Sequence, residues 1–207
     1  MKITPNTWNR IRYTLYTPIY DGVVSILTPS RERSIREIDV KPGEKVLIVG
    51  AGTGLDLDYL PPQNEITAID ITPSMVEKIK RRAKRLDLHV DARIMDGHSL
   101  KFEDDTFDVV ILHLILAVIP DPVQCMKEVS RVLKPNGRIA VFDKFLVGNA
   151  KPGFTRRILN WITSILFSNI NRQIEPLATE TGFVITADIP ANFGGNFRII
   201  RMARKIT

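Results

Sequence analysis

The sequence has 207 residues, of which 44% are hydrophobic and 25% are charged, and its formal net charge is +6. This length and composition suit one soluble domain with one hydrophobic core. The longest apolar stretches, such as residues 111–119, are far shorter than the roughly 20 residues that cross a bilayer, and the N-terminus lacks a signal-peptide pattern. We therefore expect a cytoplasmic protein without a membrane-spanning helix. The single cysteine, Cys125, excludes an internal disulfide, and the three histidines lack metal-ligand spacing, so no metal site is expected.

The charge is unevenly distributed along the chain. Residues 1–45 carry 8 Lys/Arg against 5 Asp/Glu, and residues 151–207 carry 8 against 3. Residues 46–150 carry 13 Lys/Arg against 15 Asp/Glu, so both ends are basic and the centre is slightly acidic. This asymmetry indicates an anionic partner for the two ends, although solubility alone would explain it equally well.

Apolar stretches rich in β-branched residues alternate with helical patterns along the chain. Near the N-terminus, Trp8, Ile11, Leu15 and Ile19 have helical spacing, and apolar residues between 153 and 172 follow an amphipathic helical pattern. Helices are also predicted at 73–86 and 122–133, and strands at 45–49, 65–71, 107–112, 138–142, 183–187 and 197–203. Strands that alternate with helices predict an α/β fold with a parallel sheet.

Two of these helices have clear start signals. Thr72 precedes Pro73, which suits the first helical position, and Asp121 precedes a proline in the same way. Gln124 is placed to complete a capping box with Asp121, and residues 134–137 are predicted to stop the helix.

The first two predicted strands end in residues suited to a nucleotide-like ligand. Gly50, Gly52 and Gly54 follow the first strand, and their missing side chains let the backbone approach a ligand closely. Asp70 ends the second strand, 20 residues after Gly50, which is the spacing at which an acidic residue reaches a ribose hydroxyl.

Two further signals follow in chain order. Asp96 stands beside Gly97 in a predicted turn, where its carboxylate could accept a hydrogen bond from an adenine amino group. His113 stands at the carboxyl end of the next strand. Because ligands bind beyond the carboxyl ends of parallel strands, these signals together are stronger evidence than a glycine loop alone.

With these motifs, residues 41–145 resemble the class I methyltransferases that bind S-adenosylmethionine (SAM). The resemblance rests on KPGEKVLIVGAGTG, Asp70, the Asp96-Gly97 pair, FDVVILHLILAVIPDP and EVSRVLKPNG. It implies a Rossmann-like α/β fold with a mostly parallel central sheet, an antiparallel C-terminal strand, N-terminal helices and a helical insertion. Within a single domain, it implies a helical lid at 1–40, the SAM-binding core at 41–145, an amphipathic insertion at 151–175 and C-terminal strands at 180–207.

The resemblance also implies the cofactor, SAM, with S-adenosylhomocysteine as its product, and the residues that hold it. The glycine loop would contact the amino acid part of SAM, Asp70 the ribose and Asp96 the adenine amine. The full set assigned to cofactor binding is Gly50, Ala51, Gly52, Gly54, Asp70, Ile71, Asp96, Gly97 and His113. One departure is Ile48, which stands where the family usually has an acidic residue that organises the methionine end of SAM.

The flanking segments indicate the methyl acceptor. Residues 16–21, 118–122 and 192–198, with Arg31 and Arg33, are similar to the bacterial phosphatidylethanolamine N-methyltransferases built on this fold. The resemblance therefore implies a phospholipid amine as acceptor and an anionic membrane surface as peripheral partner. A small-molecule or quinone methyltransferase is the alternative, and a SAM-binding module without catalysis is the alternative of another class. A nucleic-acid substrate is not expected, because the chain lacks an N/D-P-P-Y/F motif.

Methyl transfer to an amine requires a neutral nitrogen, so the site needs a base or a desolvating pocket. The candidate catalytic residues are Tyr20 in the predicted lid, His113 at a strand end and Asp143 after the last central strand. Tyr16 and Tyr20 could instead pack the N-terminal helix over the cofactor, and His113 could be a hydrogen-bonded core histidine.

Membrane contact is predicted for aromatic residues flanked by arginines. Trp8 has Arg10 and Arg12 nearby, and Trp161 lies in a segment that is also rich in cations, a composition typical of interfacial helices. Substrate or membrane contact is assigned to Tyr16, Arg31, Arg33, Arg156, Arg157 and Trp161, with Arg172 as a further cation. The alternative is that Trp161 packs on the sheet as part of an ordinary insertion.

Overall fold

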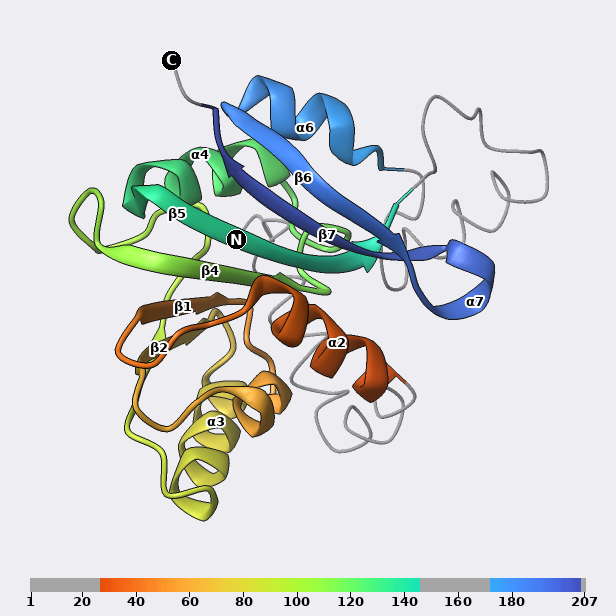
Figure 1. The fold of residues 1–207 in the computed structure, drawn as a ribbon. Coiled ribbons are helices and arrows are strands. Elements are labelled where there is room, and N and C mark those ends of the chain that lie inside the picture. The colour runs from red at the N-terminus through yellow and green to blue at the C-terminus, as the bar shows by residue number, and fades with distance from the viewer. Residues whose placement is uncertain (1–26, 146–171, 206–207) are drawn as a thin grey trace, which may run out of the picture.

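The computed structural model describes residues 27–145 and 172–205. Its strands form one seven-stranded sheet in the order β3-β2-β1-β4-β5-β7-β6 (Figure 1). The strands are β1 (Lys45–Val49), β2 (Glu65–Asp70), β3 (Val90–Ile94), β4 (Phe107–His113), β5 (Leu133–Lys144), β6 (Phe183–Pro190) and β7 (Phe197–Arg204). The helices are α2 (Thr28–Ile38), the 3-10 helix η2 (Leu55–Tyr59), α3 (Pro73–Arg85), α4 (Pro122–Val132), α6 (Ile174–Glu180) and the short α7 (Asn192–Gly195).

The sheet is parallel except at one strand. β1 pairs in parallel with β2 and β4, β2 with β3, and β4 with β5. β7 runs antiparallel to both of its neighbours, β5 and β6. The predicted fold class, a mostly parallel Rossmann-like sheet with an antiparallel C-terminal strand, is therefore confirmed.

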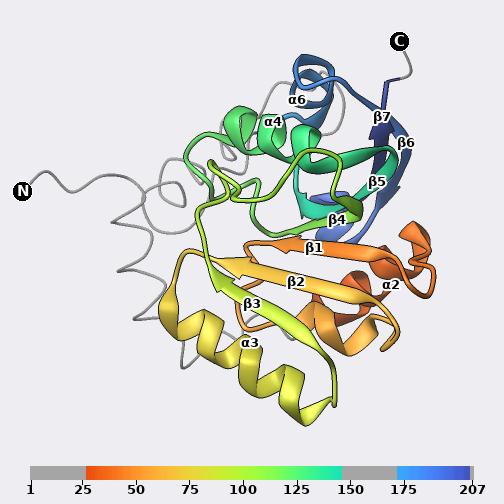
Figure 2. The ribbon, with the colours of Figure 1, turned by 90° about the vertical axis from the view of Figure 1, so that its left-hand side faces the viewer.

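Helices cover both faces of the sheet (Figures 1 and 2). On one face, Ile35 and Ile38 of α2, Leu57 of η2 and Ile79 of α3 pack in a buried cluster with β1 and β2. On the other face, α4 and α6 pack on β4, β5 and β7 in a second cluster. This arrangement leaves the carboxyl edge of β1, β2 and β4 to the loops that follow those strands.

Two strand predictions differ from the structure. β5 begins at Leu133, because residues 134–137, which we predicted as a helix stop, form a bulge opposite the register shift between Phe107 and Val109. β3 was not predicted as a strand. It is an edge strand with a polar sequence, VDARI, and none of its residues is fully buried, so its hydrophobic pattern is weak.

Among the described residues, no helix is both long and apolar enough to cross a membrane. Of the predicted N-terminal lid, the structure describes α2, which packs against β5, β7 and η2. The helices predicted around Trp8 and between 153 and 172 lie outside the described residues.

Candidate active site

A pocket lies at the carboxyl edge of the sheet, where the sequence predicts a ligand. It encloses about 710 Å³, part of it open to solvent. Its walls come from the ends of β1 and β2, the start of α3, the turn after β3 and the segment after β4. The lining residues are Val49, Gly50, Gly52, Asp70, Ile71, Thr72, Met75, Met95, Asp96, Gly97, Leu114, Ile115, Val118, Ile119 and Pro120.

The structure brings six of the nine predicted cofactor residues into this pocket, and these are Gly50, Gly52, Asp70, Ile71, Asp96 and Gly97. Ala51 and Gly54 belong to the same loop but are not part of the lining. His113 does not line the pocket either, which differs from the predicted contact with the cofactor.

The glycine loop has a backbone that side chains would disturb. Gly50, Gly52 and Gly54 all have positive φ, at 67°, 56° and 79°. A Cβ atom on Gly50 would also lie 2.7 Å from Cδ1 of Ile115, which is too close for any real contact. The loop can therefore pass directly beneath Ile115, on the opposite wall of the pocket.

Asp70 is held at the pocket by two backbone donors. Its Oδ2 atom accepts a hydrogen bond from the N–H of Gly52 at 2.9 Å, and its Oδ1 atom accepts one from Thr72 at 2.8 Å. Burial raises the pKa of Asp70 above its ordinary value, and the two backbone N–H groups only partly oppose this. These bonds join the glycine loop to the end of β2, so the carboxylate has one fixed orientation at the edge of the pocket.

Asp96 is fixed by its neighbour His98. Its Oδ1 atom accepts hydrogen bonds from the backbone N–H of His98 at 3.0 Å and from His98 Nδ1 at 2.7 Å. The N–H of Asp121 donates to His98 Nε2 at 3.2 Å, so this ring nitrogen carries no proton and Nδ1 carries it. His98 thereby links the predicted adenine-binding carboxylate to the start of α4.

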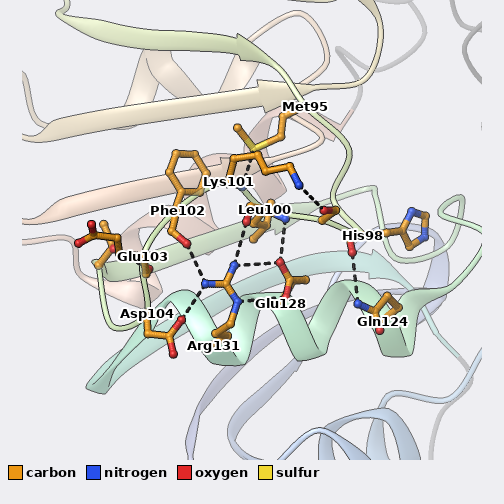
Figure 3. Close-up of polar contacts among 12 residues, drawn as sticks. Met95, His98, Leu100, Lys101, Phe102, Glu103, Asp104, Gln124, Glu128 and Arg131 are labelled. Carbon is orange, nitrogen blue, oxygen red and sulfur yellow. Dashed lines mark hydrogen bonds and ion pairs between the residues drawn. The ribbon is translucent and has the colours of Figure 1, made fainter.

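The segment that follows Asp96 is fastened to α4 by a network of polar contacts (Figure 3). Arg131 donates to the carbonyl oxygens of Leu100 and Phe102 at 2.8 and 2.7 Å, and pairs with Glu128 at 2.9 Å. Gln124 donates to the carbonyl of His98 at 3.2 Å. Its side chain does not complete the predicted capping box, although Asp121 caps α4 as expected by accepting from the Gln124 N–H.

His113 belongs to a buried polar cluster with residues of α2 and of η2, the 3-10 helix that follows the glycine loop. Its Nδ1 donates to Oδ1 of Asp56 at 2.8 Å, and its Nε2 shares a hydrogen bond with the hydroxyl of Ser34 at 2.9 Å. Arg31 donates to both carboxylate oxygens of Asp56, at 2.9 and 3.0 Å. The alternative interpretation of His113, a hydrogen-bonded core residue, agrees with this placement.

The cluster determines the ionisation of Asp56. Burial alone would raise the pKa of this carboxyl, but the positive charges of Arg31 and His113 and their hydrogen bonds outweigh it and hold the pKa well below its ordinary range. Arg31 was expected to contact the substrate or the membrane. Only 4% of its surface is exposed, so it is buried and does not face a membrane. Asp56 is not among the predicted site residues, because its only signal in the sequence is an acidic residue between Leu55 and Leu57.

Asp143, the third predicted catalytic residue, is also buried away from the pocket lining, with 1% of its surface exposed. Ile48, which stands where an acidic residue is usual, is 1% exposed and packs in the hydrophobic core. This position therefore offers no carboxylate to a ligand. Arg33 is exposed on α2. Five other predicted residues lie outside the described residues, namely Tyr16, Tyr20, Arg156, Arg157 and Trp161.

Comparison with known proteins agrees with this architecture. Residues 47–141 match the family described as "Methyltransferase domain". A SAM-dependent methyltransferase of known structure from Aquifex aeolicus superposes with a TM-score of 0.64 at 20% identity, over 83% of this chain and 88% of that one. At this identity the likeness shows the fold alone, which is a Rossmann-like α/β fold. The matched residues are therefore similar to a methyltransferase domain, and they contain the glycine loop, Asp70 and Asp96.

The fold alone does not decide the reaction. The structure of the [4+2]-cyclase SpnF superposes with a TM-score of 0.71 at 19% identity, over 87% of this chain and 82% of that one. A shared fold with a cyclase shows that the reaction must be argued from the site.

Curated relatives differ in the acceptor that their names imply. A phosphatidylethanolamine N-methyltransferase from Cereibacter sphaeroides is 26% identical over 90% of this chain and 93% of its own length. A demethylmenaquinone methyltransferase from Bacillus cytotoxicus is 34% identical over 60% of this chain and 56% of its own length. An uncharacterized transposon protein from Streptomyces fradiae is 31% identical over 74% of this chain. The chain spans about half the length of the last two relatives, at 56% and 47%.

Proposed function

We propose that this protein transfers methyl groups from SAM to the amine of a phospholipid headgroup, phosphatidylethanolamine, at a membrane surface. The observation that carries the methyltransferase part is the convergence of Asp70, Asp96 and the glycine loop on one pocket. The phospholipid part is supported by the Cereibacter relative, which this chain matches over almost its whole length.

The residues of the pocket fit SAM. In the proposal, the glycine loop lies along the methionine part, Asp70 accepts from the ribose hydroxyls and Asp96 accepts from the adenine amine. Ile71, Met95 and Ile119 supply apolar walls that suit a flat purine ring. In this proposal the methyl group would face the segment after β4, and the acceptor would approach from there.

Bound SAM would supply an activated methyl group on a sulfonium. Transfer to an acceptor nitrogen would require that nitrogen to be held neutral near the methyl group, and its proton would pass to solvent or to a base. His113 and Asp143 are engaged in buried contacts, so we propose that neither touches the acceptor. In this proposal His113 orients the side chains of Asp56 and Ser34, and Asp143 positions the backbone at Ala117. Tyr20 remains the proposed catalytic residue.

Part of the pocket wall is an apolar surface formed by Leu114, Ile115 and Val118. Leu114 lines the pocket and also packs against a buried cluster that contains Leu27, Phe142 and Phe197. Such a surface suits the acyl-bearing part of a lipid, but it would equally suit a quinone, which the Bacillus relative supports. The non-catalytic alternative rests on Ile48, which stands where the family usually has an acidic residue.

The acceptor can be identified by transfer of label. Purified protein is incubated with methyl-labelled SAM and, in separate reactions, with vesicles containing phosphatidylethanolamine and phosphatidylglycerol or with demethylmenaquinone in detergent. We expect label in the phospholipid fraction, decreasing at high salt because cations such as Arg33, Arg156 and Arg157 would bind the anionic surface.

Each outcome has a distinct meaning. Label in the quinone alone would contradict the phospholipid acceptor and support the alternative enzyme. SAM binding without label in either acceptor would favour a non-catalytic module. Salt-independent labelling of phosphatidylethanolamine would retain the acceptor but contradict binding to an anionic surface.

A further inference from the structure

One wall of the pocket is a single helical turn at residues 115–119. The N–H groups of Val118 and Ile119 both donate to the carbonyl oxygen of Ile115, at 3.0 and 2.9 Å. Ile115, Val118 and Ile119 line the pocket, and Ile115 faces Gly50 at close range. The position of this turn therefore determines the width of the pocket above the glycine loop.

The chain enters the turn through an unusual backbone conformation. Leu114 has φ at 60°, in the left-handed region that a leucine rarely adopts. Its N–H donates to the carbonyl oxygen of Phe142 on β5 at 2.8 Å. A single hydrogen bond and a strained residue would not by themselves keep the following turn in one position, so other contacts must hold it.

Those contacts come from two charged residues of opposite sign. The carboxylate of Asp143 accepts from the N–H of Ala117 at 2.8 Å. The guanidinium of Arg172 donates to the carbonyl oxygen of Leu116 and, at 2.9 Å, to that of Ile119. The carboxylate thus meets an N–H group and the guanidinium meets carbonyl groups, which matches the dipole of a helical turn.

Burial shifts the pKa values of both Asp143 and Arg172. Burial raises the pKa of Asp143, while the N–H groups of Ala117 and Lys144 and the charges of Lys144 and Arg172 oppose the rise. Burial lowers the pKa of Arg172, and the charge of Asp143 opposes that change. Two charges removed from water are seldom a net gain for stability compared with an apolar pair, so their presence calls for another role.

We infer that Asp143 and Arg172 form a positioning pair that holds the 115–119 turn against the glycine loop and thereby sets the affinity for SAM. This assigns Asp143 a role different from the predicted catalytic one. It also changes the predicted role of Arg172, which binds backbone carbonyls rather than a membrane surface. The inference rests on the proposed location of SAM in this pocket, but not on the identity of the acceptor.

The test compares Arg172→Ala with a matched variant, Arg138→Ala. Arg138 also donates to a backbone carbonyl, that of Ile38 at 2.7 Å, and pairs with the carboxylate of Glu44 at 2.7 Å. It lies near the other end of β5 and is not part of the pocket lining. Calorimetric titration should show SAM binding at least about tenfold weaker in Arg172→Ala and unchanged in Arg138→Ala.

Chemical rescue separates positioning from general loss of structure. Guanidinium ion at millimolar concentration should restore part of the SAM affinity of Arg172→Ala, because it can occupy the site of the missing side chain, and should not change that of the wild type. Wild-type affinity in Arg172→Ala, an equal loss in Arg138→Ala, or absence of rescue would each overturn the inference. If the wild-type protein itself fails to bind SAM, the proposed function fails together with the inference. If the wild type binds SAM but Arg172→Ala binds it equally well, only the inference fails.

Discussion

Replacing Asp70 with alanine is expected to weaken SAM binding about 10- to 100-fold. In the proposed complex this carboxylate accepts hydrogen bonds from the ribose hydroxyls, and a hydrogen bond to a charged group contributes about 1.5 to 3 kcal/mol. The variant also loses the bonds from the N–H groups of Gly52 and Thr72, which join the glycine loop to β2. Calorimetric titration of the purified variant with SAM measures the loss directly.

A suitable control is Asp91→Ala. Asp91 lies on β3, in register with Thr67 of β2, and pairs with Arg93 outside the pocket lining. Its removal should leave SAM affinity within about twofold of the wild type, since exposed ion pairs contribute little. Equal losses in Asp70→Ala and His113→Ala, with both variants folded, would place the ribose elsewhere.

Replacing Asp56 with asparagine is expected to cause a large loss of stability. The change leaves Arg31 buried without its negative partner, and breaking a buried ion pair from one side costs about 3 to 5 kcal/mol. For a chain of this size each kcal/mol lowers the melting temperature by about 2 to 4 °C, so a fall of roughly 10 °C is expected. Thermal unfolding followed by circular dichroism measures it.

The difference in unfolding free energy between the wild type and Asp56→Asn should also depend on pH. The folded-state pKa of Asp56 lies below its ordinary value of 3.8, so the stability it contributes is fully present above that value and is lost as pH falls through the folded pKa. The wild type and Asp56→Asn should therefore differ most near neutral pH and converge in acid. A difference in unfolding free energy that grows on acidification would contradict this sign.

The matched control is Asp58→Asn on the same 3-10 helix. Asp58 pairs with Arg82 at 3.2 Å, but the Asp58 side chain is 31% exposed, so the expected loss is less than about 1 kcal/mol. If Asp58→Asn were as destabilising as Asp56→Asn, breaking the buried Arg31–Asp56 pair would not explain the loss of stability.

The cofactor side of the site could be predicted from sequence because it depends on topology. Parallel strands bring their carboxyl ends to one edge, so residues that end successive strands must lie together. This rule places Gly50 and Asp70, the predicted turn with Gly97 places Asp96, and the structure brings all three to the pocket. Backbone conformation added a second signal, because the loop needs positive φ at its glycines.

The supporting contacts could not be predicted in the same way. The cluster of Arg31, Asp56 and His113 joins α2, η2 and β4, and neither periodicity nor motif spacing reports how three elements meet. His113 stands at a strand end, which favours a ligand contact, but its side chain binds Asp56 of η2 and Ser34 of α2 and is not part of the pocket lining. The composition around Arg172 indicates only a cation that could contact a membrane. Its contacts with the carbonyl groups of Leu116 and Ile119 depend on tertiary structure.

The central claim is that the pocket at the carboxyl edge of β1 and β2 binds SAM. Calorimetric titration of the wild-type protein with SAM, S-adenosylhomocysteine and NAD tests it most directly. We expect saturable binding of SAM and of S-adenosylhomocysteine and none of NAD, because the loop has the spacing G-x-G-x-G and not that of a dinucleotide site. Absence of heat with SAM at millimolar concentration, or binding of NAD in its place, would contradict the assignment.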